Sequence, residues 1–303
     1  MFLSCDIGNT DTVFGIYNNL DGNCNDEEKD IFTIYRVSTS EICSAEALFN
    51  TLSKLFLNDG ICISDIKHIC ISSVVPSQNQ FYKLFCSQLN CHAIFISSVS
   101  RTGINLMVEN PDKLGADRIV NASYAYSLSK EFQIIVDAGT ALKIDIIDAA
   151  GNFKGGVIFP GIKTLAVCLN EKTELLPLIN INELNCGKNS GNILNDNNKD
   201  VNNGVSENDI NSSNTIQLIG DNTVKAIQSG LLYGTVFLIE GFIKEIQKQY
   251  DKTECKVIFT GGLSNIIAAQ CRMKGLKIID GLWTLKGLKF LYKLNAARAK
   301  SQM

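Results

Sequence analysis

Two short segments of the chain combine an aspartate, a glycine-containing turn and a threonine. The first reads Asp6-Ile7-Gly8-Asn9-Thr10, and the second reads Asp137-Ala138-Gly139-Thr140. Glycine lets backbone N–H groups come close to an anion, and the threonine hydroxyl adds a hydrogen-bond donor. The aspartate can hold Mg²⁺ directly or through water. Two such turns that face each other would hold a polyphosphate together with its metal ion.

A third position for close approach of a ligand is Gly261-Gly262, which follows Thr260 and a strand-like run over 256–259. It would suit a nucleoside. Each of the three motifs is weak alone, but their order along the chain indicates a nucleotide-binding α/β fold in two parts. The chain lacks the sequence patterns of a P-loop, of a dinucleotide-binding turn and of a hydrolase nucleophile elbow. This excludes a P-loop nucleotide-binding protein, a dinucleotide-binding enzyme of that type and an α/β-hydrolase.

Asp117 and Arg118 lie in the segment Gly115-Ala116-Asp117-Arg118, at the start of a helix predicted over 117–128. An aspartate there can accept the proton of a substrate hydroxyl during phosphoryl transfer. An arginine there can bind a substrate carboxylate through two parallel hydrogen bonds. The same two residues also fit a helix cap beside a surface arginine, because aspartate is favoured at helix N-termini. This segment alone leaves both interpretations open.

The elements that must position these residues form two similar halves. Apolar runs over 2–5 and 13–17 flank the first turn, and runs over 134–136 and 142–147 flank the second, which predicts two β-hairpins. The interval from Asp6 to Asp137 is close to one domain length, so a duplicated α/β unit explains the repeat. Helical spacing predicts helices over 41–57, with Ser38 and Glu41 as a capping box, over 223–249, and over 278–293.

Two segments of the second half stand out by composition. Residues 180–214 are rich in asparagine and poor in large apolar side chains, so we predict a disordered insertion there. The helix predicted over 223–249 carries Gly230, Gly234 and Gly241. Because glycine lowers helix stability, we expect these positions to admit a close neighbouring helix, within the chain or across a dimer.

The composition narrows the class of protein further. The 303 residues include 28 Lys and Arg against 31 Asp and Glu, a net charge of −3, which argues against a protein held to nucleic acid by phosphate contacts. No apolar run reaches the length of a membrane span, and the N-terminus has no basic stretch typical of a secretory signal. The eleven cysteines include no C-x-x-C pair, which favours reduced thiols. We therefore expect a cytoplasmic protein without a membrane or nucleic-acid partner.

Taken together, the motifs resemble those of type III pantothenate kinases, within the superfamily of actin, sugar kinases and chaperone ATPases. The matching segments are DIGNT at 6–10, SSVVP at 72–76, ENPDKLGADRIVNA at 109–122, DAGTA at 137–141, GGVIFPGI at 155–162, LP at 176–177, GDNTVKAIQSG at 220–230, FTGGL at 259–263 and TLKGL at 284–288. They appear in family order along almost the whole chain. The resemblance implies two duplicated ribonuclease H-like (actin-like ATPase) α/β domains, at 1–128 and 129–303, with a cleft between them.

The same resemblance implies ATP-dependent phosphorylation of pantothenate on its primary hydroxyl, the first step of coenzyme A biosynthesis. It further implies Mg²⁺, a monovalent cation such as K⁺ or NH₄⁺, and a homodimer with the substrate near the subunit interface. By motif position, Asp117 would be the general base and Asp6 would organise Mg²⁺. Phosphate or nucleoside would be bound by Asp6, Gly8, Asn9, Thr10, Gly139, Thr140, Gly261 and Gly262. Pantothenate would be bound by Gly115, Arg118 and Thr223, and the monovalent cation by Asp137.

Four residues depart from the family pattern. Val108 replaces a usual tyrosine, Leu142 and Lys143 replace a pair of threonines after the second turn, and Asp221 replaces a basic residue. The Lys143 ammonium would bind phosphate from a new direction or face solvent. The departures keep two other hypotheses open: a non-catalytic regulatory or accessory relative, and a kinase of another small hydroxy acid.

Overall fold

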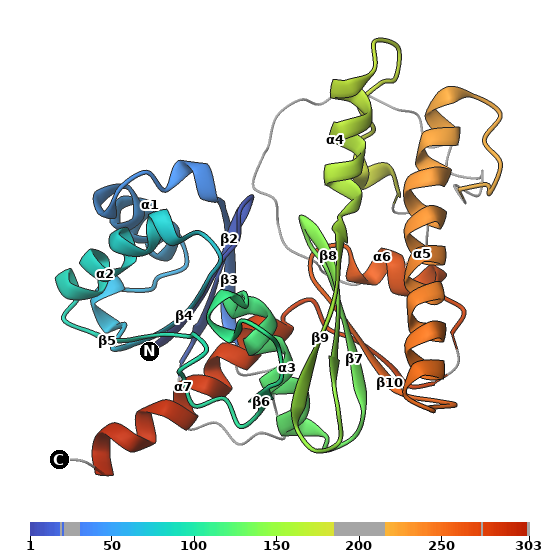
Figure 1. Ribbon diagram of the computed structural model, residues 1–303. Helices are drawn as coiled ribbons and strands as arrows, with labels where there is room; N and C mark the ends of the chain where they lie inside the picture. Colours follow the sequence, from blue (N-terminus) through green and yellow to red (C-terminus); the bar gives the residue numbers. More distant parts are fainter. Residues whose placement is uncertain (19, 21–30, 185–215, 274, 302–303) are drawn as a thin grey trace.

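The computed structural model describes residues 1–18, 20, 31–184, 216–273 and 275–301. These residues form two α/β lobes, each built on one sheet (Figure 1). The disordered insertion predicted over about 180–214 lies outside the described residues, except for its first positions, where η6 spans Ile181–Leu184.

The N-terminal sheet has five strands in the order β3-β2-β1-β4-β5. They span Phe2–Ile7 (β1), Asp11–Tyr17 (β2), Ile31–Ser38 (β3), His68–Ser73 (β4) and His92–Phe95 (β5). Strand β1 is antiparallel to β2 and parallel to β4. Helices α1 (Ala45–Asn58) and α2 (Asn79–Gln88) bury Leu48, Phe56 and Phe85 with the side chains of one face of this sheet.

The C-terminal sheet has six strands in the order β11-β10-β7-β8-β9-β6. They span Asn105–Leu106 (β6), Gln133–Ala138 (β7), Ala141–Ile147 (β8), Asn152–Pro160 (β9), Lys256–Thr260 (β10) and Lys277–Ile279 (β11). Helices α4 (Ile162–Lys172), α5 (Thr223–Gln249) and α6 (Ser264–Gln270) lie on its outer side (Figure 1).

The two sheets confirm the predicted duplication. Apart from β6, the second order, β9-β8-β7-β10-β11, repeats the first, β3-β2-β1-β4-β5. The patterns of burial along β1 and β7 are identical, and so are those along β2 and β8. In each first strand the only half-buried position is the aspartate, Asp6 or Asp137. Each aspartate thus lies at the same point of its own lobe.

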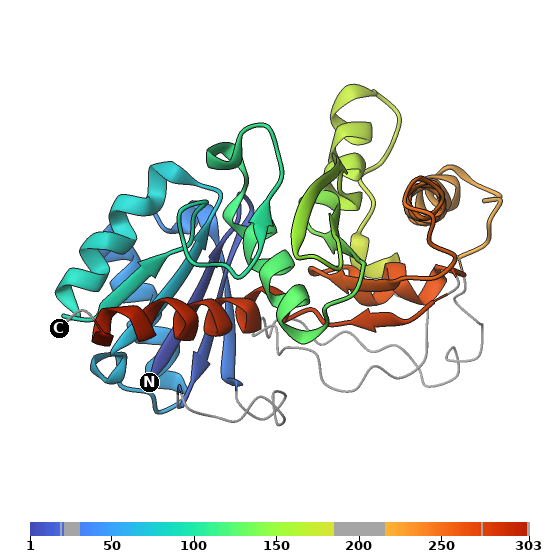
Figure 2. The ribbon, with the colours of Figure 1, turned by 60° about the horizontal axis from the view of Figure 1, so that its bottom comes forward.

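Helices α3 (Ala116–Leu128) and α7 (Trp283–Ser301) pack together between the two sheets (Figures 1 and 2). Residues Ile119 and Val120 of α3 and Leu288 of α7 share a buried cluster with the N-terminal sheet. On the other side, Trp283 contacts Tyr124 in a cluster that includes the C-terminal sheet, and its indole N–H donates to the Asn121 carbonyl at 3.1 Å. These two helices therefore join the lobes.

The division at residues 128 and 129 stays a prediction. The two sheets follow it, except that β6 comes from the first segment and pairs with β9. In addition, α7 comes from the second segment and packs against β1 and β4.

Two predicted helix boundaries were wrong. The helix predicted over 41–57 begins at Ala45, and its N-cap is Ser44, whose hydroxyl accepts the Ala47 N–H at 3.0 Å. Ser38 instead ends strand β3. The helix predicted over 278–293 begins at Trp283, because Ile278 and Ile279 pair with β10 as strand β11.

Helix α5 has the length and composition that would allow it to cross a membrane, and 44% of its most apolar window is buried in the structure. Ile227, Leu231, Val236, Ile239 and Ile243 face the core of the C-terminal lobe. This packing accounts for its apolar character as that of a core helix. The expected absence of a membrane partner remains a prediction.

Candidate active site

The two glycine turns occupy corresponding places, each between the first two strands of its lobe. In the first turn, the Thr39 N–H donates to the Thr10 carbonyl at 2.8 Å, and the Thr39 hydroxyl donates to the Gly8 carbonyl at 2.7 Å. In the second turn, the Gly161 N–H and the Thr164 hydroxyl both donate to the Thr140 carbonyl, at 2.9 and 2.7 Å. Hydrogen bonds from other residues of its own lobe thus hold each turn in place.

The two turns meet at their threonines. The hydroxyl oxygens of Thr10 and Thr140 lie 2.9 Å apart although the residues are 130 positions apart in sequence. Both residues are exposed. The structure therefore brings the two predicted phosphate turns together, with two hydroxyl donors at the point where they face each other.

Asp117 lies in the first turn of α3, where its carboxylate has two partners. Oδ1 accepts the N–H of Arg118 at 2.8 Å, and Oδ2 lies 2.5 Å from the ammonium nitrogen of Lys143. A Cβ at Gly115 would lie 2.6 Å from Asp117 Oδ1, so only glycine leaves room for this carboxylate. The cap of α3 is Gly115 rather than Asp117, which removes the simple capping interpretation of this aspartate.

The Lys143 ammonium binds a second aspartate as well. Its Nζ lies 2.7 Å from Asp137 Oδ2, and Lys143 is the residue paired with Asp137 across the β7–β8 hairpin. The side chains of Asp117, Asp137 and Lys143 are only 12%, 15% and 14% exposed. The expectation that Lys143 faces solvent was therefore wrong, whereas phosphate binding by its ammonium stays a prediction.

Arg118 forms a second ion pair beside the first. Its Nε and Nη2 lie 3.0 and 2.5 Å from Asp145 Oδ1, and its guanidinium lies 5.4 Å from the centre of the Phe153 ring. Burial raises the pKa of Asp145 to about 6, although Arg118 lowers it. The pair holds the Arg118 guanidinium in place through Nε and Nη2. Within the described part of the chain, Arg118 Nη1 donates no hydrogen bond.

Asp6 completes the acidic group. Burial, together with the charges of Asp117 and Asp137, raises its pKa to about 7, although Lys143 acts to lower it. For Asp137 too, burial raises the pKa against the effect of Lys143. Asp117 and Asp137 thus lie at one ammonium, and their charges act on Asp6.

The surroundings of Asp6 fit a role in holding Mg²⁺. Among the described ion pairs, none involves Asp6, so its carboxylate is available to a cation. The described residues contain no group of three acidic, histidine or cysteine side chains that could hold a metal alone. Mg²⁺ commonly binds through one or two carboxylates together with substrate phosphates and water, so a single carboxylate beside a phosphate turn suits it.

The third motif packs directly against the second turn. Gly261 has a positive φ of +89°, and a Cβ there would lie 2.7 Å from Asp137 Oδ1 and 2.8 Å from the backbone of Ala138. A Cβ at the neighbouring Gly262 would meet nothing within 4 Å. Gly261 is therefore needed for the packing of the two loops, whereas Gly262 borders open space.

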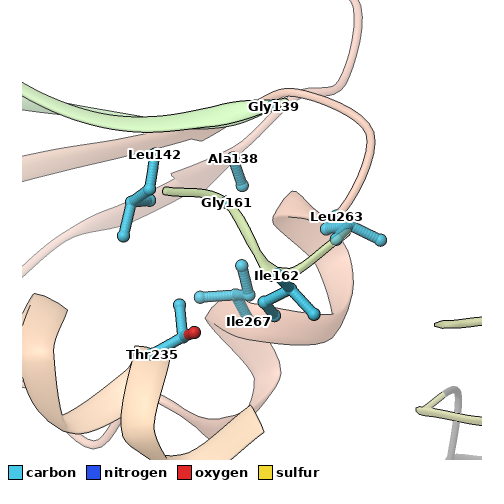
Figure 3. A pocket seen from close by; sticks show the side chains of 8 residues that line it. All are labelled: Ala138, Gly139, Leu142, Gly161, Ile162, Thr235, Leu263 and Ile267. Carbon is cyan, nitrogen blue, oxygen red and sulfur yellow. The ribbon is translucent and has the colours of Figure 1, made fainter. Parts of the chain in front are cut away.

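A small apolar hollow lies behind the second turn, and it has no room for a water molecule (Figure 3). Its lining residues are Ala138, Gly139, Leu142, Gly161, Ile162, Thr235, Leu263 and Ile267. It is therefore far smaller than ligand pockets, which measure roughly 300–1,000 Å³. The Thr235 hydroxyl donates to the Leu231 carbonyl within its own helix. The hollow is thus a packing gap in the core, and Leu142 belongs to that core.

Thr223 is not brought to these residues within one chain. It is the exposed first residue of α5, on the outer side of the C-terminal sheet, whereas α3 lies on the other side (Figure 1). Val108 packs against the cluster around Phe153 and Ile135. Asp221 binds Lys225 on the exposed start of α5, at 2.8 Å.

Sequence reasoning missed Asp145 and the buried position of Lys143. The sequence of β8 held the signal for both, because its residues 143 and 145 are charged and alternate with apolar neighbours. Such alternation places both side chains on one face of the strand, the face that carries Asp137 on the neighbouring strand.

Comparison with known proteins gives a consistent result. The sequence model of the family described as Type III pantothenate kinase matches residues 2–245. A Type III pantothenate kinase from Halalkalibacterium halodurans is 32% identical over 296 residues, which cover 97% of this chain and 100% of the relative. Another from Desulforapulum autotrophicum is 34% identical over 294 residues, with 96% of each chain covered.

Solved structures support the fold. A protein described as a 2-dehydro-3-deoxygalactonokinase from Sinorhizobium meliloti aligns with a TM-score of 0.52 at 12% identity, over 97% of this chain and 96% of the other. A protein described as a Baf family transcriptional activator from Campylobacter jejuni aligns with a TM-score of 0.51 at 19% identity, over 97% and 99%. At these identities the likeness concerns architecture, and it confirms the predicted fold class.

Proposed function

The chain belongs to the type III pantothenate kinase family, and we propose that it transfers the γ-phosphoryl group of ATP to the primary hydroxyl of pantothenate. It is an enzyme, a phosphotransferase. The observation that carries the proposal is the meeting of Asp117 and Asp137 at one ammonium, beside two facing glycine turns. A base, a phosphate-binding pair of turns and a metal-binding carboxylate are the parts that phosphoryl transfer to an alcohol needs.

In this proposal the two turns bind the phosphates of ATP. The Asn9 and Gly139 N–H groups and the hydroxyls of Thr10 and Thr140 donate hydrogen bonds to phosphate oxygens. Gly8, whose own N–H donates to the Asp11 carbonyl at 3.0 Å, shapes the first turn. Gly261 and Gly262 border the nucleoside, where Gly262 leaves open space. Asp6 holds Mg²⁺, which when bound neutralises charge that develops on the transferred group.

The acceptor side is formed by the start of α3. Arg118, held by Asp145, offers its remaining N–H groups to the carboxylate of pantothenate. Asp117 accepts the proton of the acceptor hydroxyl as the oxygen attacks the phosphorus. Gly115 keeps the Asp117 carboxylate in place because any larger residue would collide with it.

A homodimer would use the exposed side of α5. Gly230, Gly234, Phe237 and Gly241 are spaced by three or four residues and share one face, Phe237 is 55% exposed, and Cβ atoms at the three glycines would meet nothing within 4 Å. A helix of a second copy can approach closely there. Thr223, exposed at the start of the same helix, would then contact pantothenate bound to the other copy. Gly234→Trp should give a monomer by light scattering and a higher KM for pantothenate.

The test of the proposed function is ADP release with ATP and Mg²⁺ in the presence of pantothenate or of other small hydroxy acids. We expect turnover with pantothenate as the preferred acceptor, by an enzyme acting in the cytoplasm. Preference for another hydroxy acid would replace the substrate. Binding of ATP by calorimetry without turnover of any acceptor would instead identify an accessory relative, the reading that Val108, Leu142, Lys143 and Asp221 keep open.

A further inference from the structure

Lys143 is held between two aspartates of the proposed active site. Its Nζ lies 2.7 Å from Asp137 Oδ2 and 2.5 Å from Asp117 Oδ2, and its side chain is 14% exposed. The corresponding position of the first hairpin, paired with Asp6, is Val13. The duplicated fold therefore does not require a lysine here, which points to a role specific to the second turn.

The charge balance of the site explains why a cation is needed at this point. Asp117 and Asp137 are mostly buried, and two buried carboxylates that share a site repel each other. The Lys143 ammonium forms an ion pair with each of the two carboxylates and so compensates both charges.

The resemblance to the family implies a monovalent cation at Asp137, and the residues present do not fit one. Asp137 Oδ2 is already bound by the ammonium, and Oδ1 lies against Gly261, where an added atom would be only 2.8 Å from the backbone C and N of Ala138. A K⁺ ion on the same carboxylate would have to lie beside another positive charge of the same valence.

We propose that the Lys143 ammonium permanently replaces the monovalent cation at Asp137, so that this enzyme works without added K⁺ or NH₄⁺. In this role Lys143 is a positioning residue, which compensates the charges of Asp137 and Asp117 and holds both carboxylates in place. The inference rests on the proposed kinase function for its kinetic test and on cation binding alone for its second test.

The kinetic test compares KCl with choline chloride at equal ionic strength, with ATP supplied as its Tris salt. For the wild type we expect kcat to differ less than twofold between the two salts. Lys143→Thr removes the ammonium and leaves room and a hydroxyl oxygen for an ion, so its kcat should be low in choline and rise at least tenfold with K⁺. Lys143→Met fills the space without a charge or an oxygen ligand and should stay low in both salts.

Lys154→Thr is the matched control. Lys154, on β9, also binds an aspartate, since its Nζ lies 3.3 Å from Asp148 on the β8–β9 connection, away from the three aspartates. This variant should behave as the wild type in both salts. A wild type that needs K⁺ by tenfold or more would overturn the proposal. So would a Lys143→Thr enzyme that K⁺ does not stimulate, or an equal stimulation of Lys143→Met.

Thermal unfolding tests the same idea without turnover. KCl should raise the Tm of Lys143→Thr above its value in choline chloride and leave the wild-type Tm unchanged. If the wild type proves inactive with pantothenate, the proposed function fails, while this measurement still decides the role of Lys143. A Tm increase with K⁺ in the wild type equal to that in Lys143→Thr would reject the replacement of the cation by Lys143.

Discussion

Asp117 Oδ2 on α3 lies 2.5 Å from Lys143 Nζ on β8. The next residue of α3, Arg118, forms an ion pair with Asp145, two positions further along β8. Side chains two residues apart on a strand share one face. Two consecutive helix residues are therefore tied to one face of a single strand. These ion pairs fix where the first turn of α3 lies on the sheet, and the position of the proposed base depends on Asp145 as well as on Lys143.

The Arg118–Asp145 pair gives the first prediction. Asp145→Asn keeps the shape of the side chain but removes the charge that holds the guanidinium. Hydrogen bonds to charged groups contribute about 1.5–3 kcal/mol, and about 1.4 kcal/mol corresponds to tenfold in affinity. We expect the KM for pantothenate to rise about tenfold or more, with the KM for ATP within twofold, measured by steady-state kinetics. An equal rise of both KM values would contradict a specific role in positioning Arg118.

The second prediction concerns Asp117. Asp117→Asn retains a hydrogen-bonding side chain but cannot accept the substrate proton, so kcat should fall by about 10²–10⁴, the usual contribution of a general base. Asp112→Asn is the control, because Asp112 is an exposed residue of the 3-10 turn Pro111–Lys113 that precedes α3, and its kcat should stay within twofold of the wild type. A kcat of Asp117→Asn within threefold of the wild type would remove the residue from this role.

The sequence allowed the two hairpins and their duplication to be predicted because they depend on local patterns. Asp6 and Asp137 each follow an apolar run and precede a tight turn, and alternation and turn residues report such a structure directly. Here the local pattern and the packed structure agree. The duplication gives each lobe its own turn, but the meeting of Thr10 and Thr140 depends on how α3 and α7 join the two lobes, which no local pattern reports.

The contacts of Lys143 and Asp145 could not be predicted in the same way. The hairpin register decides that Lys143 lies beside Asp137, but only the packing of α3 on the sheet brings Asp117 and Arg118 to the same strand. Likewise, apolar spacing did not separate the short strand Lys277–Ile279 from the helix that follows it, because a short apolar run fits either element. Long-range packing decided both cases.

The third prediction separates the two glycines of the nucleoside motif. Gly261→Ala places a Cβ against Asp137 and Ala138 at a φ of +89°, so we expect a loss of about 1–3 kcal/mol in the free energy of unfolding. Gly262→Ala is the matched comparison, because its Cβ enters open space and should change that free energy by less than about 0.5 kcal/mol. Gly262→Ala should instead raise the KM for ATP, since the added methyl would meet a bound nucleoside. Unchanged ATP kinetics in a stable Gly262→Ala enzyme would place the nucleoside elsewhere.

The fourth prediction follows from the raised pKa of Asp6. An unfolded chain releases this proton near the ordinary value of 3.8, whereas burial in the folded chain raises the pKa to about 7. The folded state therefore binds more protons between these values, and its stability falls as the pH rises through this window. Asp6→Asn cannot titrate at this position. The free energy of unfolding of the variant, relative to that of the wild type, should therefore be higher at pH 8 than at pH 4, by on the order of 2–4 kcal/mol.

Thermal or urea unfolding from pH 4 to pH 8 in the presence of EDTA measures this difference, and Asp148→Asn supplies a control of opposite sign. Burial acts to raise the pKa of Asp148, but hydrogen bonds from Asn152 and Lys154 outweigh it and lower that pKa. The Asp148 carboxylate therefore stabilises the folded state above the ordinary pKa of 3.8 and loses that effect as the pH falls. Asp148→Asn should be less stable than the wild type at pH 8, with the deficit shrinking toward acid. If the stability of Asp6→Asn relative to the wild type did not change with pH, the Asp6 carboxyl group would not have the raised pKa that its buried surroundings indicate.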